Sequence, residues 1–306
     1  MNKNLIISTS INHPTKAIKK FDNFKNWKLI VIGDKKTPKN YKLKNGIYVS
    51  PNDQVKIDKK LSDLIGWNCI ERRNMGLVLA KKMRAKIIAL VDDDNIPYNN
   101  WENNILIGKN IKAKFYNLKQ PVFDPIYQTN YKNLWHRGFP VENIDERENI
   151  KYKYKNVTVD VQAGFWNGDP DVDAVCRMIY KPNCKFNKNY FPFFSNKISP
   201  FNSQNTFINA KLLKYYFLFP DQGRMHDIWA SYYLQYKKKI NILYSEASVL
   251  QKRNKHNLIT DLKNELIGLK HTAKIIKKIS EKKFKLNEFF TKRAIKAYNQ
   301  YLKHFE

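Results

Sequence analysis

Three consecutive aspartates, Asp92, Asp93 and Asp94, are the residues of this sequence best suited to chemistry. They directly follow the apolar run 85–91, which predicts a β-strand. Adjacent carboxylates repel one another unless a cation neutralises them. Mg²⁺ and Mn²⁺ favour such oxygen ligands, and Mg²⁺ is commonly held by one or two carboxylates and a substrate phosphate. The run therefore predicts a divalent metal site, and the alternative is a solvated acidic turn or helix cap.

The first hundred residues predict how this acidic run is positioned. Strands are expected at 5–9, 27–32, 47–50 and 85–91, and helices at 16–24 and 70–82. Nearly continuous apolar strands that alternate with helices are typical of a parallel sheet covered on both faces. Ligands of open α/β sheets bind at the carboxyl ends of the strands, which is where the acidic run lies.

The rest of the chain is less regular. Prolines interrupt residues 95–155, an ordered block covers 157–180, and a helix is expected from Asp227 onward. Basic helical sequence follows at 257–279 and 286–304. We predict one domain at 1–252, with halves at 1–97 and 98–252, and a basic helical extension at 253–306.

The net charge of +29, from 56 Lys and Arg against 27 Asp and Glu, suggests an acidic partner. A field this positive attracts polyanions, so a nucleic-acid-binding protein is one alternative. The lysines are scattered, however, and the composition also resembles that of proteins from AT-rich genomes. No helix-turn-helix, zinc or aromatic RNA-binding pattern is visible, so we expect no specific nucleic-acid partner.

The cysteines and apolar runs bear on where the protein works. Cys69, Cys176 and Cys184 have spacings that suit neither a zinc site nor a disulfide framework. No apolar run approaches the roughly 20 residues of a membrane helix. We therefore expect a cytoplasmic protein, whose basic surface would favour the inner face of an anionic membrane.

Several segments resemble a known family. Asp92 to Asp94 is similar to the metal-binding motif of glycosyltransferases of the type-A fold, and the wider set resembles the STELLO-type glycosyltransferase-like proteins. The matching segments are 9–15, 27–38, 67–76, 91–97, 167–177 and 202–206. They span most of residues 5–235, whereas the basic helices lie outside the resemblance. A weaker resemblance, confined to the acidic run and the fold, is to reversibly glycosylated polypeptides, which act as sugar mutases.

The resemblance implies a Rossmann-like nucleotide-diphospho-sugar transferase fold with a mostly parallel central sheet. Residues 1–97 would then bind the nucleotide and residues 98–252 the acceptor. The implied activity moves a sugar from a nucleoside diphosphate, UDP in particular, to a hydroxyl of a glycan or lipid-linked acceptor, with Mn²⁺ or Mg²⁺. A sugar mutase or self-glycosylating protein on the same fold is the alternative.

The resemblance also places the donor. The candidates are Ser8, Thr9, Asn12, Gly33, Asp34, Lys35, Arg72, Arg73, Asn74, Asp92 and Asp93. The loop after the first strand would hold the nucleoside, and the acidic residue after the second strand would bind base or ribose. An arginine at the start of the helix before the acidic run can donate two hydrogen bonds to a diphosphate. The alternatives are a Gly-Asp turn and solvated helix charges.

A second acidic cluster is implied to bind the acceptor or the sugar. The candidates are Trp166, Asn167, Asp169, Asp171, Asp173, Asn202, Gln204 and Trp229. Carboxylates accept paired hydrogen bonds from vicinal hydroxyls, and tryptophan rings stack on sugars or bases. Helix capping and core packing are the alternatives.

The start of the late helix is implied to complete the site. An inverting type-A transferase needs a carboxylate that removes the acceptor proton, and Asp227 is the candidate. His226 is the candidate third metal ligand beside Asp92 and Asp94. A helix N-cap is the alternative for Asp227.

Overall fold

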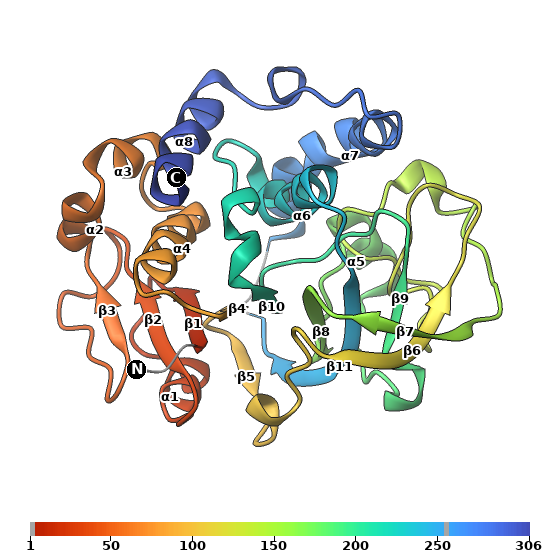
Figure 1. Ribbon diagram of the computed structural model, residues 1–306, viewed down its shortest axis with the longest axis horizontal. Helices are drawn as coiled ribbons and strands as arrows, with labels where there is room; N and C mark the ends of the chain where they lie inside the picture. Colours follow the sequence, from red (N-terminus) through yellow and green to blue (C-terminus); the bar gives the residue numbers. More distant parts are fainter. Residues whose placement is uncertain (1–3, 254–256) are drawn as a thin grey trace.

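The computed structural model describes residues 4–253 and 257–306. Within them one mixed sheet of eleven strands runs through the molecule, in the order β3-β2-β1-β4-β10-β8-β11-β9-β6-β7, with β5 paired to β11. The strands are β1 Asn4–Thr9, β2 Lys28–Ile32, β3 Ile47–Val49, β4 Ile87–Val91, β5 Asn95–Pro97, β6 Asn110–Tyr116, β7 Lys153–Thr158, β8 Val161–Gly168, β9 Phe193–Ser195, β10 Asn205–Asn209 and β11 Ile242–Gln251. Helices cover the sheet on both sides of its parallel half (Figure 1).

The four strands β1 to β4 are parallel, as the sequence predicts, and the apolar residues of β1, β2 and β4 are mostly buried, whereas Ile47 at the start of β3 is exposed. Because β1 lies between β2 and β4, the carboxyl ends of these strands meet at one edge of the sheet. The antiparallel strand β10 then pairs with β4, with Asn205 opposite Val91. This pairing brings the segment before β10 to the same edge. The predicted α/β fold is confirmed, and beyond β4 the sheet is mixed.

The described residues form eight α-helices, six of which begin after a residue whose side chain caps them. They are α1 Lys16–Phe21, α2 Pro51–Ile57, α3 Lys59–Ile65, α4 Arg73–Lys82, α5 Ala174–Tyr180, α6 His226–Lys237, α7 Leu258–Ser280 and α8 Lys292–Leu302. Helices α4 and α6 follow directly on 3₁₀ turns and have no side-chain cap. Thr15 caps α1, and Ser50 with Asp53 forms a capping box on α2, which the sequence analysis did not predict. The helix expected at 16–24 ends at Phe21, because Asp22 instead accepts hydrogen bonds from the backbone of residues 44 and 45.

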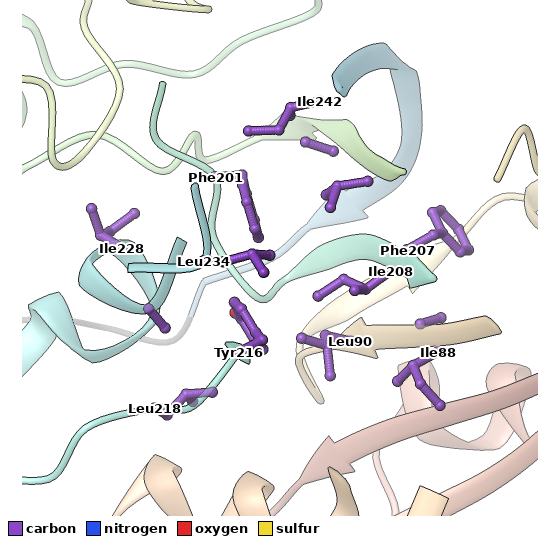
Figure 2. Close-up of a cluster of buried hydrophobic side chains, with 14 of the residues drawn as sticks. Ile88, Leu90, Phe201, Phe207, Ile208, Tyr216, Leu218, Ile228, Leu234 and Ile242 are labelled. Carbon is purple, nitrogen blue, oxygen red and sulfur yellow. The ribbon is translucent and has the colours of Figure 1, made fainter. Parts of the chain in front are cut away.

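The core lies on both faces of the sheet. On one face, Leu90 and Ile208 of neighbouring strands point toward Tyr216 and Leu234 (Figure 2). On the other face, the fully buried Trp101 packs against aromatic rings that include Trp27, Phe21 and Phe207. Helix α6 is buried from His226 to Leu234, so it is a core element that lies beside the carboxyl-end edge.

The C-terminal helices pack onto both halves of the chain. Helix α8 contacts α3, and α7 contacts α5 and the 3₁₀ turn Gly223–Met225 (Figure 1). The single helix expected at 286–304 is divided into a short turn, Leu286–Glu288, and α8. No helix in residues 4–253 and 257–306 has the length and hydropathy needed to cross a bilayer.

Candidate functional site

Two adjoining pockets lie at the edge where the parallel strands end. The first pocket has a volume of about 290 Å³ and is lined by the loop 9–12, the end of β2, residues from 68–72 and Asp93. The second pocket has a volume of about 150 Å³ and is lined by Asp92 and Asp94, residues before β10, the start of α6 and the end of β11. Ile70 lines both pockets, so the two volumes are neighbours.

The acidic run divides between these pockets. Asp93 lines the first pocket, where its Oδ2 accepts hydrogen bonds from Ser10 Oγ at 2.5 Å and Asn12 Nδ2 at 3.2 Å. Its backbone oxygen accepts a further hydrogen bond from Thr15 Oγ1 at 2.5 Å. Asp93 therefore fixes the loop after β1, and Asp92 and Asp94 are left to the second pocket.

Asp92 is joined to a buried arginine. Arg73 Nη2 donates to Asp92 Oδ1 at 2.7 Å, and Arg73 Nη1 donates to the backbone oxygen of Ser203 at 2.6 Å. Burial raises the pKa of Asp92, and Arg73 opposes that rise. Arg73 thus forms an ion pair with Asp92 inside the protein, and it connects the acidic run to the segment before β10.

Among the residues that the structure describes, no arginine donates a hydrogen bond to Asp94. Its Oδ1 is buried and makes no hydrogen bond. Burial and, next, the neighbouring Asp92 raise the pKa of Asp94 to about 7, although Arg253 opposes the change. A carboxyl group in this setting gains from any cation that binds beside it.

Unpaired polar atoms gather in the second pocket. Asp94 Oδ1, Gln204 Oε1 and Gln251 Oε1 are all buried without a hydrogen-bond partner, and all three residues line this pocket. Arg253 also lines it, and its guanidinium forms long ion pairs with Asp169 and Asp171. A buried polar group left unpaired costs about 1–3 kcal/mol. Such groups are rare in native proteins, and each calls for an explanation such as an ion, water or ligand. The second pocket is therefore suited to a polar ligand with both hydroxyl and anionic groups.

Asp92 and Asp94 suit a divalent cation whose remaining coordination positions are filled by a bound substrate and water. In the parts of the chain that the structure describes, no group of three or more His, Cys, Asp or Glu side chains is arranged to hold a metal. Asp92 and Asp94 supply two carboxylates to one pocket. Mg²⁺ is usually bound by one or two carboxylates, with substrate phosphates and water in the other positions. The two aspartates meet that requirement.

His226, the predicted third metal ligand, lines the same pocket. Its Nδ1 lies 2.8 Å from the backbone oxygen of Gly223, and its Nε2 lies 3.9 Å from Asp227 Oδ1. The hydrogen bond to the backbone orients the ring with Nε2 as the nitrogen available to a ligand. Its place as a metal ligand remains a prediction.

The structure argues against Asp227 as the general base. Its carboxylate accepts hydrogen bonds from Arg137, at 3.1 and 3.2 Å, and from the backbone N–H of Ser203 at 3.0 Å. Burial would raise the pKa of Asp227, but Arg137 and then His226 bring it to about 2. A carboxylate with these partners is a weak base. Its role here is structural, inside α6 rather than at an N-cap.

The second acidic cluster is also internal to the protein. Asp171 is fully buried and paired with Arg137 through two hydrogen bonds at 2.8 and 2.9 Å. Asp173 caps α5 and accepts a hydrogen bond from Trp135, so the capping alternative is the one observed. Asp169 pairs with Arg177. The prediction that these carboxylates bind sugar hydroxyls is corrected for Asp171 and Asp173, which are buried and paired within the protein. The Asp169 side chain is 30% exposed, and its role as a ligand stays a prediction.

Most of the aromatic and amide candidates for acceptor or sugar binding also have partners inside the protein. Trp166 and Trp229 are buried in the core, and Trp229 Nε1 donates to Thr272 of α7 at 3.1 Å. Asn167 bonds to Tyr98, and Asn202 bonds to Asp171. Among the residues predicted to bind acceptor or sugar, Gln204 is the one that lines the second pocket.

Of the donor candidates, the structure brings Thr9, Asn12, Asp34, Arg72 and Asp93 to the first pocket. Their predicted position beside one ligand is consistent with the geometry. Asp34 is nonetheless largely occupied, because it accepts hydrogen bonds from the backbone of Lys35 and Cys69.

Arg72 lines the first pocket, but its guanidinium is hydrogen-bonded to neighbouring parts of the protein. Its guanidinium donates to Gln54 Oε1, Ser62 Oγ and the backbone oxygens of Ser62 and Gly66. Trp67 lies against it, with 3.8 Å between the guanidinium carbon and the ring centroid. It therefore has no free N–H fork for a diphosphate, contrary to the prediction.

Five donor candidates line neither pocket: Arg73, described above, and four others. Asn74 bonds through its side chain to the backbone N–H and oxygen of Leu218, and Ser8 is buried within β1. Gly33 packs against the ring of Tyr48, and the Lys35 ammonium lies 5.3 Å from the Trp67 ring centroid. Each of these contacts serves the fold.

Several pocket residues escaped the sequence analysis. Arg137 comes from the irregular stretch after β6, and Gln251 and Arg253 come from the end of β11, a strand that was not predicted. Ser10 was adjacent to a predicted residue and could have been included, since small polar residues after a strand commonly contact ligands. Nothing in the local pattern distinguishes Arg253 from the chain's other basic residues.

Comparison with known proteins now adds to this geometry. No family model matches the chain. The probable glycosyltransferase STELLO2 of Arabidopsis thaliana is 28% identical over 184 residues, which cover 56% of this chain and 24% of that protein. STELLO1 of the same plant is 26% identical over 225 residues, which cover 67% of this chain and 29% of that protein. Over these segments the chain is similar to the STELLO proteins.

The STELLO-like chain spans only about a quarter of the length of these curated relatives. A solved structure, glucosyl-3-phosphoglycerate synthase from Mycobacterium tuberculosis in complex with phosphoglyceric acid, matches with a TM-score of 0.46 and 10% identity. The match covers 90% of this chain and 79% of that one. A similarity this low carries no functional argument.

Proposed function

We propose that the STELLO-like chain is a glycosyltransferase of the type-A fold that uses a nucleotide-sugar donor. The nucleoside lies in the first pocket, and the diphosphate and sugar lie in the second. The observation that carries this proposal is the division of the acidic run, which places Asp93 at one pocket and Asp92 with Asp94 at the other. A ligand that passes over the run would fill both volumes.

The pocket sizes and chemistry support this order. The larger first pocket combines the apolar side chains of Ile11, Ile32 and Ile70 with polar groups, as suits a base and a ribose. The smaller second pocket holds the unpaired carboxylate of Asp94 and the unpaired amides of Gln204 and Gln251. These oxygens can accept hydrogen bonds from sugar hydroxyls.

Asp92 and Asp94 would hold the divalent cation, Mn²⁺ or Mg²⁺. Such a cation stabilises the negative charge that develops on a departing diphosphate. The protein contributes orientation, because Arg73 fixes Asp92 and the hydrogen bonds of Asp93 fix the loop that would cover the nucleoside. The acceptor would be a hydroxyl of a glycan or a lipid-linked sugar.

A ligand screen tests the proposal. Thermal shift with nucleoside diphosphates and nucleotide-sugars, each with Mn²⁺ and with a chelator, should show stabilisation by at least one of them, because a ligand of the folded state raises the melting temperature. Calorimetry should then show that Asp94→Asn loses the metal-dependent part of UDP binding. Asp63→Asn, on an exposed helix face, is the matched control and should bind as the wild type does.

The proposal fails if no nucleotide stabilises the wild-type protein in either condition. It fails equally if Asp92→Asn and Asp94→Asn bind UDP with unchanged affinity and metal dependence. Mass spectrometry of the protein after incubation with a donor that binds separates transfer to an acceptor from self-glycosylation, since only the latter adds the mass of a sugar to the chain.

A further inference from the structure

We infer that Gln204 and Gln251 recognise hydroxyls of the donor sugar, and that this sugar is neutral rather than acidic. The inference depends on the proposed function and names the class of sugar that the second pocket takes. Both glutamines line that pocket beside Asp94. Gln204 is 7% exposed and Gln251 is 3% exposed, so both side chains are buried polar groups.

The backbone of each glutamine is fixed at the edge of the sheet. Gln251 is the last residue of β11, and it lies opposite Asn95 of β5 on one side and Gly168 of β8 on the other. The backbone N–H of Gln204 donates to Asn202 Oδ1 at 3.1 Å, and its backbone oxygen accepts a hydrogen bond from Asn95 Nδ2 at 2.9 Å. Asn95 therefore joins the two segments directly after the acidic run.

The side-chain oxygens are the parts of these residues that stay unpaired. The Oε1 atoms of Gln204 and Gln251 are buried and have no hydrogen-bond partner among the described residues. A buried polar atom without a partner is rare in native proteins, and it points to a ligand or a water that completes it. The two oxygens are therefore free for a ligand that enters the second pocket.

These oxygens select a ligand that donates hydrogen bonds. A sugar hydroxyl donates one, whereas an ionised phosphate has no proton to donate. The two glutamine oxygens therefore suit the sugar, and Asp92 with Asp94 remains for the cation of the diphosphate. Because the glutamines and the two aspartates line the same small pocket, the sugar that the glutamines contact is the one attached to the diphosphate.

The charges of the pocket favour a neutral sugar. Three arginines line the pocket, and each is already paired with carboxylates of the protein: Arg137 with Asp171 and Asp227, Arg224 with Asp261 and Glu265, and Arg253 with Asp169 and Asp171. His226, the other basic residue of the lining, lies 3.9 Å from Asp227. A uronic acid would add a further carboxylate beside Asp92 and Asp94, and like charges repel.

Calorimetry without any acceptor tests the inference. UDP, UDP-glucose and UDP-glucuronic acid, or the same three forms of another nucleotide-sugar if that one binds the wild type, are titrated with Mn²⁺ into wild type, Gln204→Met and Gln251→Met. Methionine has a similar length and removes the amide. Each variant should bind the neutral nucleotide-sugar about 3- to 10-fold more weakly, as expected for the loss of one hydrogen bond, and should bind UDP as the wild type does. Wild type should bind the uronic acid form at least about tenfold more weakly than the neutral form.

Gln300→Met is the matched control, since that glutamine lies on α8, bonds to Asp58 and lines neither pocket. It should bind all three ligands as the wild type does. If a glutamine variant proves unfolded by circular dichroism, single-deoxy analogues of the neutral nucleotide-sugar take its place. At least one analogue should then bind the wild type about 3- to 10-fold more weakly than the parent sugar, and equal affinity for every analogue counts against the inference.

The remaining outcomes separate this inference from the proposed function. Unchanged affinity for the neutral nucleotide-sugar in folded variants, while Asp94→Asn loses metal-dependent UDP binding, overturns the inference and leaves the proposed function standing. An equal loss for UDP and the nucleotide-sugar also overturns it, because the glutamines would then contact the nucleotide. A wild-type preference for the uronic acid form overturns the assignment to a neutral sugar. Absence of nucleotide binding in the wild type refutes the proposed function itself.

Discussion

Replacing Arg137 with glutamine should strongly destabilise the protein at neutral pH. The Arg137 side chain is 5% exposed and donates to both Asp171 and Asp227 at distances between 2.8 and 3.2 Å. The substitution leaves two buried carboxylates without their cation. Breaking a buried ion pair from one side costs about 3–5 kcal/mol, and we expect a loss in that range in the free energy of unfolding.

The loss should depend on pH, and its sign follows from the carboxylates. Burial would raise the pKa of Asp171, but Arg137 holds it well below its ordinary value in the folded protein. Wild-type Asp171 therefore contributes stability above the unfolded pKa of about 3.9, and this contribution is lost as the pH falls through the folded pKa. In the variant the burial is unopposed, so the folded pKa rises above the unfolded one, and the penalty is largest at neutral pH.

Urea unfolding of wild type and Arg137→Gln at pH 7 and pH 4.5 measures both effects. The difference in unfolding free energy should be several kcal/mol at pH 7 and clearly smaller at pH 4.5. The control Arg293→Gln removes an exposed pair and should change stability by no more than about 1 kcal/mol at either pH. A loss below about 1 kcal/mol for Arg137→Gln, or an equal loss at both pH values, would refute the reasoning.

Three further substitutions separate scaffold from binding surface. Asn74→Ala should cost about 1–3 kcal/mol in urea unfolding, because the buried backbone of Leu218 loses both its partners, and calorimetric UDP affinity should not change. Trp229→Phe loses the hydrogen bond to Thr272 and should lower stability by about 1–3 kcal/mol, again without changing nucleotide affinity. Gly138→Ala should cost roughly 1–3 kcal/mol by thermal unfolding, since φ is +93° and the new Cβ would lie 2.2 Å from a buried isoleucine of α6.

The sequence predicts the parallel half of the fold well, for a physical reason. Residues 5–9 and 85–91 are almost continuous apolar runs, because strands buried on both faces need apolar side chains at every position. The acidic run could be placed at the sheet edge from its position after the second of these runs. Strand β10 was missed because its sequence, Asn205–Asn209, mixes amides with apolar residues, and its amides bond inside the fold.

The candidate site was predicted in its acidic part and missed in its basic part. A carboxylate run is rare enough to stand out, whereas the arginines that line the second pocket, Arg137, Arg224 and Arg253, are three of 56 basic residues. Whether a guanidinium is filled depends on which acceptors surround it, and those acceptors come from distant segments. Gln54 of α2 and Ser62 of α3 fill Arg72, and no local pattern could have indicated that.

The side chains that are paired within the protein hold in place the polar atoms of the second pocket that have no partner. A chain of buried contacts runs from Asp92 through Arg73 to Ser203, and from Ser203 through Asp227 to Arg137. It joins the end of β4 to α4, to the segment before β10 and to α6, so the pocket wall is fixed before any ligand arrives. Binding is most effective when the contacting groups are already held in place. Because the scaffold carboxylates and arginines satisfy one another, the oxygens that remain unpaired around the second pocket, those of Asp94, Gln204 and Gln251, are the ones available to a ligand.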